Sequence, residues 1–285
     1  MPLYLVSTPI GNLEDITVRA LRILRDDAAL IACEDTRHSH KLLEHYQIRK
    51  PLLSYHEHNE VARTAEILEA LERGHSVALI SDAGTPLISD PGYRVVTAAI
   101  DKGFPVIPLP GPSAALAALA ASGLPTDEFR FIGFLPPKSG ARQKVLEDLA
   151  HETATVIAYE SPHRILDTLR AMAEILGERP VVVARELTKL HEEFLRGSAA
   201  SILQKLVERG SVRGEITLVI GRGEQHAKID DPLAEIQKLQ NEAGLDRMEA
   251  IKAVAKRMGL PKREVYRLAA ERLAAGNDNP GKRHR

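Results

Sequence analysis

The sequence predicts an α/β fold, in which two α/β domains enclose a cleft and a helical tail of the helix-turn-helix type follows them. Short apolar segments rich in β-branched residues alternate with helical patterns over residues 1–224, whereas only helical patterns follow. A length of 285 residues exceeds what one hydrophobic core usually supports, which favours more than one domain. We therefore expect a first domain at residues 1–124, a second at 125–224 and a tail at 225–285.

The first domain is expected to contain a mostly parallel sheet. Its strands are predicted at residues 3–7, 29–33, 52–55, 77–81 and 106–109. Between the third and fourth strands, Asn59 suits the N-cap of a helix and Gly74 suits the left-handed residue that ends it. Such crossovers place helices on both faces of the sheet and a ligand outside the carboxyl ends of its strands.

The second domain is also expected to be α/β. Its predicted strands are residues 129–133, 155–159, 181–184 and 216–220. Helices are expected at residues 142–150, 165–176 and 199–208, the last closed by Gly210. The boundary between the domains is placed at the turn of residues 123–126, where the alternation of strands and helices pauses.

The tail is predicted to be helical and basic. Helices are expected at residues 231–241, 247–258 and 262–274, and disorder at residues 276–285. The tail has 13 Lys and Arg against 9 Asp and Glu, a charge of +4 in a chain whose net charge is −1. In the second helix, one face is expected to hold Met248, Ile251, Ala255 and Met258.

A short turn with a glycine joins the second and third tail helices, as in helix-turn-helix proteins that bind nucleic acid. Lys262, Arg263 and Arg267 follow this turn and are candidate contacts to phosphates. A helical hairpin used for packing or dimerisation is an equal alternative.

The composition excludes several classes of protein and site. No apolar stretch is long enough to span a membrane and no basic signal-peptide region precedes an apolar one, so we expect a cytoplasmic protein. Cys33 is the only cysteine, which leaves no internal disulfide or cysteine zinc site. His56 and His58 could suggest a metal, but a His-x-His pair beside a helix cap is typical of a solvated loop and no His-Glu-x-x-His pattern occurs, so no metal is expected.

Three clusters of small and turn-forming residues follow predicted strands, at residues 7–12, at residues 81–86 with 90–92, and at residues 110–114. Glycine permits close approach of a ligand to the backbone, proline fixes the turn, and aspartate accepts hydrogen bonds from hydroxyl or ammonium groups. No phosphate-loop motif or Gly-x-Gly-x-x-Gly motif occurs. Any one cluster suits an ordinary turn, but the three together favour a site for a polar, folded ligand.

These residues resemble the tetrapyrrole-methylase-like methyltransferases over nearly the whole chain. The resemblance rests on the segments at residues 8–15, 33–37, 81–86, 110–114, 131–136, 160–164, 185–189 and 214–217. It implies that S-adenosylmethionine binds in the cleft between the domains. The positions that match cofactor motifs are Pro9, Asp82, Ala83, Thr85, Pro86, Ile88, Ser113 and Ala114 in the first domain, and Tyr159, Leu187, Ile216 and Thr217 in the second.

The resemblance also indicates a branch of this family. Enzymes that act on tetrapyrroles carry Gly-Asp-Pro where this chain has the sequence of residues 81–86, which favours the branch that methylates a cytidine ribose 2'-hydroxyl in 16S ribosomal RNA. The implied partner is this RNA or the small ribosomal subunit, and a homodimer is expected. Two alternatives stay open: a tetrapyrrole methyltransferase, and a non-catalytic factor that binds RNA or the ribosome.

Transfer of a methyl group to a hydroxyl requires a base. The strand-end segment at residues 34–38 supplies candidates, with Asp35 expected as the base ahead of Glu34, and with Arg37 and His38 as phosphate contacts. The alternative is that these acids only stabilise a helix N-terminus. Glu160 and Glu186 are rival acids that can instead pair with neighbouring arginines, and a second RNA-facing edge is expected at Lys138, Arg142 and Lys144.

Overall fold

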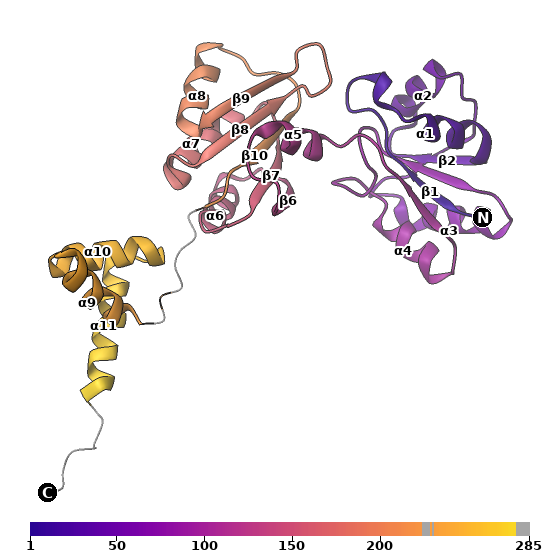
Figure 1. The fold of residues 1–285 in the computed structure, drawn as a ribbon. Coiled ribbons are helices and arrows are strands. Elements are labelled where there is room, and N and C mark those ends of the chain that lie inside the picture. Colours follow the sequence, from indigo (N-terminus) through magenta and orange to yellow (C-terminus); the bar gives the residue numbers. More distant parts are fainter. Residues whose placement is uncertain (224–228, 230, 278–285) are drawn as a thin grey trace, which may run out of the picture. The chain divides into compact units, whose positions relative to one another are not determined.

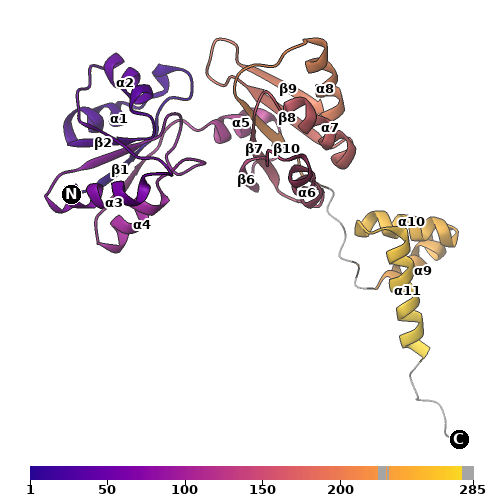
Figure 2. The same ribbon diagram turned by 180° about the vertical axis from the view of Figure 1, so that it is seen from behind.

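The structure is a computed structural model that describes residues 1–223, 229 and 231–277. The chain divides into two compact units, one formed by Met1–Leu146 and Ala154–Arg222 and the other by Glu147–Thr153 and Gly223–Arg285. Figures 1 and 2 show two β-sheets with their helices in the first unit and the helices of the tail in the second. Of the segment expected to be disordered, residues 278–285 lie outside the described residues.

The first sheet is entirely parallel, as predicted. It consists of β1 (Leu3–Val6), β2 (Leu30–Cys33), β3 (Leu52–Ser54), β4 (Val77–Ile80) and β5 (Val106–Leu109), in the order β3-β2-β4-β1-β5. The strands β4, β1 and β5 are therefore neighbours, and the three strand-end clusters found in the sequence meet at one edge of the sheet.

Helices cover both faces of this sheet because its strands are apolar on both sides. In β2, Ile31 and Cys33 enter one core and Ala32 enters the other. The first core is covered by α1 (Val18–Arg22), a π-helical turn and α2 (Thr36–His45), and the second by α3 (Glu60–Glu72) and α4 (Tyr93–Asp101).

Gly74 ends helix α3 as predicted, whereas Asn59 does not cap it through its side chain. Gly74 has a φ of +84° just beyond the helix, in the left-handed region that glycine adopts without strain. Asn59 stands at the N-cap, but its side chain accepts from the backbone N–H of His56 and donates to the carbonyl of Ser54 instead of capping the helix. The helix was thus predicted correctly, although Asn59 stabilises the preceding turn.

The second sheet is mixed. Its strands are β6 (Phe129–Phe134), β7 (Thr155–Glu160), β8 (Pro180–Arg185), β9 (Glu193–Ser198) and β10 (Ile216–Ile220), in the order β6-β7-β10-β8-β9. Only β6 and β7 pair in parallel. The sequence did not predict β9, an edge strand in which only Phe194 and Leu195 are large apolar residues.

The second sheet is accompanied by α5 (Ala114–Ser122), α6 (Ser139–Leu149), α7 (Ile165–Leu176) and α8 (Ala199–Glu208). Helix α5 packs on this sheet (Figure 1), and its residues Ala115, Ala118 and Leu119 belong to the same core cluster as Ile157 and Val219. The chain therefore begins to pack on the second sheet at α5, whereas the domain boundary was predicted after residue 124.

The tail unit is a small helical domain with its own core, formed by α9 (Pro232–Ala243), α10 (Arg247–Met258) and α11 (Lys262–Asn277). Gly259 has a φ of +64° in the turn between α10 and α11, which matches the predicted helix-turn-helix geometry. The predicted apolar face was wrong at Met248, which is 66% exposed, whereas Ala250 and Val254 are buried. Among the described helices, none is both long and apolar enough to cross a membrane.

Candidate active site

Hydrogen bonds tie together the three loops that leave β1, β4 and β5. Thr8 and Gly84 exchange backbone hydrogen bonds of 2.8 and 3.0 Å, and the Thr8 hydroxyl donates to the Ser81 carbonyl at 3.0 Å. The Thr85 hydroxyl lies 3.0 Å from that of Ser7 and 3.1 Å from the carbonyl of Pro112. The loops therefore form one rigid wall at the carboxyl edge of the sheet.

A cavity of about 430 Å³ lies between this wall and the second sheet. Most of the residues that the resemblance assigned to the cofactor line it: Asp82, Ala83, Thr85, Ile88, Ser113, Ala114, Tyr159, Leu187, Ile216 and Thr217. Pro9 and Pro86 do not; Pro9 lines an adjoining cavity and Pro86 is buried in the turn. The sequence motifs thus converge on one cavity although they are distributed from residue 82 to residue 217.

An aspartate that the sequence did not indicate as a catalytic candidate also lines this cavity. Burial, together with the nearby carboxylates of Glu34 and Asp82, raises the pKa of Asp90 to about 6 against an opposing hydrogen bond with Ser81. Burial, followed by the charge of Asp82, also raises the pKa of Glu34. The sequence could have indicated this aspartate through the Asp-Pro-Gly turn at residues 90–92, which belongs to the second of the three strand-end clusters.

Asp35 has a different environment. It caps α2, its carboxylate accepting the backbone N–H of Arg37 at 2.8 Å, and this hydrogen bond is the main reason that its pKa is lowered. The guanidinium of Arg37 lies 3.6 Å from the same carboxylate and its side chain is 92% exposed. Neither Asp35 nor Glu34 lines the cavity, so the geometry favours the helix-terminus alternative for Asp35.

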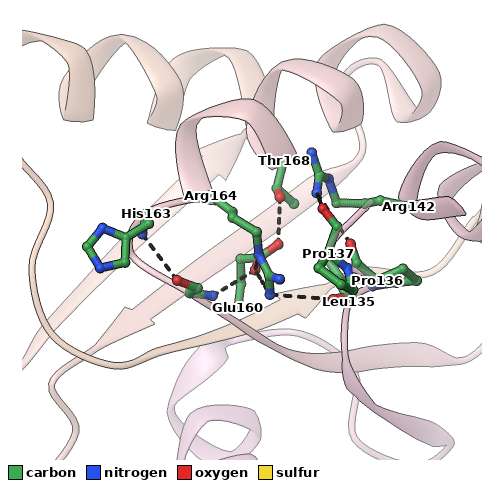
Figure 3. Close-up of polar contacts among 9 residues, drawn as sticks. Leu135, Pro136, Pro137, Arg142, Glu160, His163, Arg164 and Thr168 are labelled. Atoms are coloured by element: carbon green, nitrogen blue, oxygen red, sulfur yellow. Dashed lines mark hydrogen bonds and ion pairs between the residues drawn. The ribbon is translucent and has the colours of Figure 1, made fainter. Parts of the chain in front are cut away.

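Glu160 is a buried carboxylate that also lines the cavity, and Figure 3 shows its polar contacts. It accepts hydrogen bonds from the Ser161 backbone N–H at 2.7 Å, from Nε of Arg164 at 2.9 Å and from the Thr168 hydroxyl at 2.6 Å. Arg164 also donates to the Leu135 carbonyl at 3.5 Å. These hydrogen bonds hold the Ser161 turn, and the pairing with Arg164 is the alternative that the sequence left open for this acid.

Arg142 requires a correction. It was expected to face RNA, but it is 5% exposed and its guanidinium donates to the carbonyls of Pro136 and Pro137, each at 3.3 Å (Figure 3). A guanidinium supplies several donors, and here they satisfy loop carbonyls inside the fold. Lys138 and Lys144 are exposed and stay available as RNA contacts.

Glu186, the other rival acid, also stabilises a loop. Its carboxylate accepts from the Lys189 ammonium at 2.9 Å and from the Glu215 backbone N–H at 3.0 Å, and the Lys189 hydrogen bond lowers its pKa. A side chain at Gly11 would collide with the methylenes of Lys189, so the Lys189 stem lies directly on the loop that follows β1. The Thr188 hydroxyl accepts the Asn12 backbone N–H at 3.1 Å and fixes the same contact.

The described part of the chain contains no cluster of metal-ligating side chains. No group of three or more His, Cys, Asp or Glu side chains converges there in a metal-binding arrangement. The ring of His56 pairs instead with the side-chain amide of Asn59, at 3.0 Å.

Comparison with known proteins matches residues 2–203 to the family of Tetrapyrrole (Corrin/Porphyrin) Methylases. The chain is 48% identical over 272 residues to the ribosomal RNA small subunit methyltransferase I of Halalkalibacterium halodurans, covering 93% of both chains. It is 47% identical to the protein of the same name from Synechocystis, covering 96% of this chain and 99% of the other.

Solved structures match the fold at lower identity. A cobalt precorrin-4 methyltransferase aligns with a TM-score of 0.57 and 18% identity, covering 77% of this chain and 94% of the other. A uroporphyrin-III C-methyltransferase from Thermus thermophilus aligns with a TM-score of 0.54 and 22% identity, at the same coverage of 77% and 94%. These two likenesses concern the fold alone.

Proposed function

The chain belongs to the tetrapyrrole methylases and, within them, to the ribosomal RNA small subunit methyltransferase I family, and we propose that it methylates the ribose 2'-hydroxyl of a cytidine in 16S ribosomal RNA with S-adenosylmethionine as the donor. The observation that carries this proposal is the cavity between the two sheets, where the cofactor positions implied by the sequence come together. A ribosomal substrate also implies a cytoplasmic location, and we expect the enzyme to act as a homodimer.

The residues of the cavity fit S-adenosylmethionine. A volume of about 430 Å³ is in the range of small-molecule sites. The carboxylate of Asp82 is suited to the ammonium or ribose hydroxyls of the cofactor, and Ser113 and Thr217 add hydroxyl groups. Leu187 and Ile216 supply apolar surface on which an adenine ring can lie.

S-adenosylmethionine supplies an activated methyl group on its sulfonium. When bound, the cofactor would donate this methyl group to the ribose oxygen, and a side chain of the protein would accept the proton of the hydroxyl. The cavity walls contribute by holding the two reactants in line, which can account for a large part of the rate enhancement.

We propose Asp90 as this base, in place of Asp35 and Glu34. Asp90 lines the cavity, and its pKa of about 6 leaves it ionised at neutral pH yet more basic than an ordinary aspartate. Glu34 does not line the cavity, but its negative charge contributes to the raised pKa of Asp90, and Asp35 caps α2. The Asp82 carboxylate accepts a hydrogen bond from the backbone N–H of Asp35 at 3.2 Å, and we assign Asp82 to ligand binding.

RNA contacts outside the cavity are proposed for Arg37, Lys138 and Lys144, and for Lys262 and Arg263 in the tail, all of which are exposed. Arg267 is less suited, because its guanidinium is paired with Glu264 and Glu271.

Labelled S-adenosylmethionine tests this function with three acceptors: naked 16S ribosomal RNA, assembled small subunits and a tetrapyrrole precursor. We expect label only in RNA or subunits, and nucleoside digestion should recover it as 2'-O-methylcytidine. Label on a base, or only on the tetrapyrrole, would contradict the proposal. Absence of transfer to all three acceptors, with RNA binding retained, would support the non-catalytic alternative.

A further inference from the structure

A second cavity, of about 320 Å³, adjoins the first. Ile10, Asp82, Ala83 and Glu215 line both, so the turn after β4 forms part of a shared wall. A ligand in the second cavity would meet a ligand in the first at this wall. Two adjoining cavities suit a reaction with two substrates, because one can bind the methyl donor and the other the acceptor.

The second cavity has an acidic side and a basic side. Asp82 lies at the shared wall, whereas His38 and Lys41 enter from α2. Lys189 also lines the cavity, but its ammonium is already bonded to Glu186 and Glu215. Lys41 is exposed, and no carboxylate of the described residues forms an ion pair with it, so it carries the uncompensated positive charge of the cavity.

This pattern matches the chemistry of one ribonucleotide in an RNA strand. The hydroxyls of a ribose donate hydrogen bonds that a carboxylate such as Asp82 can accept, and the negatively charged phosphodiester is attracted by Lys41. Leu13 and Leu42 line the remainder and supply apolar surface for a base. Proteins that act on single nucleotides commonly receive them splayed out of the strand in pockets of this kind.

Resting on the proposed function, we propose that the second cavity binds the target ribonucleotide of the RNA, with its ribose at Asp82 and Ala83 and its phosphate against Lys41 and His38. The cofactor then occupies the first cavity, and the 2'-hydroxyl enters that cavity beside Asp82 and Ala83, where it meets the methyl group and the proposed base Asp90. Helix α2 thereby contributes the phosphate contacts, and Asp35, which caps it, positions that helix.

The test replaces Lys41 by Gln and uses Lys205→Gln as the control. Lys205 is an exposed lysine on α8 that lines neither cavity, so its replacement removes the same charge elsewhere. Binding of a 16S RNA fragment containing the target cytidine is measured as a function of salt, together with kcat, KM for RNA and the affinity for S-adenosylmethionine.

For Lys41→Gln we expect RNA affinity to fall about tenfold and the slope of log K against log salt to become shallower by about 0.7, as for loss of one phosphate contact in single-stranded RNA. The KM for RNA should rise while affinity for S-adenosylmethionine stays unchanged. A methylphosphonate beside the target cytidine should weaken binding to the unaltered enzyme but not to the variant, because the two changes remove the same contact.

Two results would overturn the proposal. One is RNA binding by Lys41→Gln equal to that of Lys205→Gln, and the other is a loss of cofactor affinity, which would assign Lys41 to the first cavity. Failure of the unaltered enzyme to methylate RNA would refute the proposed function itself, so the two failures are distinguishable.

Discussion

Asp90→Asn removes the charge of the proposed base and nearly preserves its shape. Asparagine cannot accept the hydroxyl proton, so the rate of methyl transfer in a single turnover should fall by about 10² to 10⁴. In the unaltered enzyme the same rate should increase with pH up to about 6 and level off above it, because ionised Asp90 is the reactive form. At pH 5 about one tenth of the enzyme would be active.

The same substitution should stabilise the protein, which separates a catalytic role from a structural one. The folded protein raises the pKa of Asp90 from 3.8 to about 6, so it favours the neutral form. This contribution to stability is full below pH 3.8 and is lost as the pH rises through 6. A pKa shift of this size corresponds to about 3 kcal/mol, which we reduce to about 1–2 kcal/mol because the side chain is partly exposed.

Asp90→Asn should therefore raise the Tm by a few degrees at pH 8, and by much less at pH 4. Single-turnover methylation by quench flow and thermal denaturation at both pH values measure the two effects. Asp35→Asn is the matched control, since asparagine also caps helices well and this residue should be dispensable for chemistry. Near-normal methylation by Asp90→Asn, or its loss in Asp35→Asn alone, would refute the assignment.

Two further predictions concern the second sheet and the tail. Thr168→Val removes the hydroxyl that donates to the buried carboxylate of Glu160 and should lower the free energy of unfolding by about 1–3 kcal/mol, measured by urea denaturation. The control Thr97→Val removes an exposed hydrogen bond on α4 and should cost less. Equal losses in the two variants would contradict the proposed role of the Glu160 hydrogen bonds. Deletion of residues 231–285 should weaken RNA binding and flatten its salt dependence, and an unchanged salt slope would favour the packing or dimerisation alternative for the tail.

The first sheet was predictable because each strand is a short apolar run bounded by turn residues. The prediction failed where tertiary pairing replaces local preference. Strand β9 is recognisable only from its pairing with β8, since its own sequence contains Arg196 and Gly197. Helix α5 precedes the turn of residues 123–126 in sequence, yet its alanine-rich surface packs on the second sheet.

The site was predictable where its residues belong to motifs and not where they depend on neighbours in space. Asp82 and Thr217 were expected to meet at one ligand, and they line one cavity. Asp90 was not expected as a base, because its pKa depends on burial and on Glu34, which follows a different strand. Likewise Arg142 was expected at the surface because a sequence gives no indication that Pro136 and Pro137 leave carbonyls for it to satisfy.

The shared wall explains why the strand-end turn at residues 81–86 is held so firmly. Methyl transfer depends on an in-line approach, so a small displacement of either reactant lowers the rate steeply. The Thr8–Gly84 hydrogen bonds join this turn to the loop after β1, and Thr85 joins it to the loop after β5. If Asp82 contacts both reactants from this wall, the distance between them is set by the backbone of the first sheet. Disturbing the Thr8–Gly84 pairing should then slow methyl transfer more than it weakens the binding of either ligand.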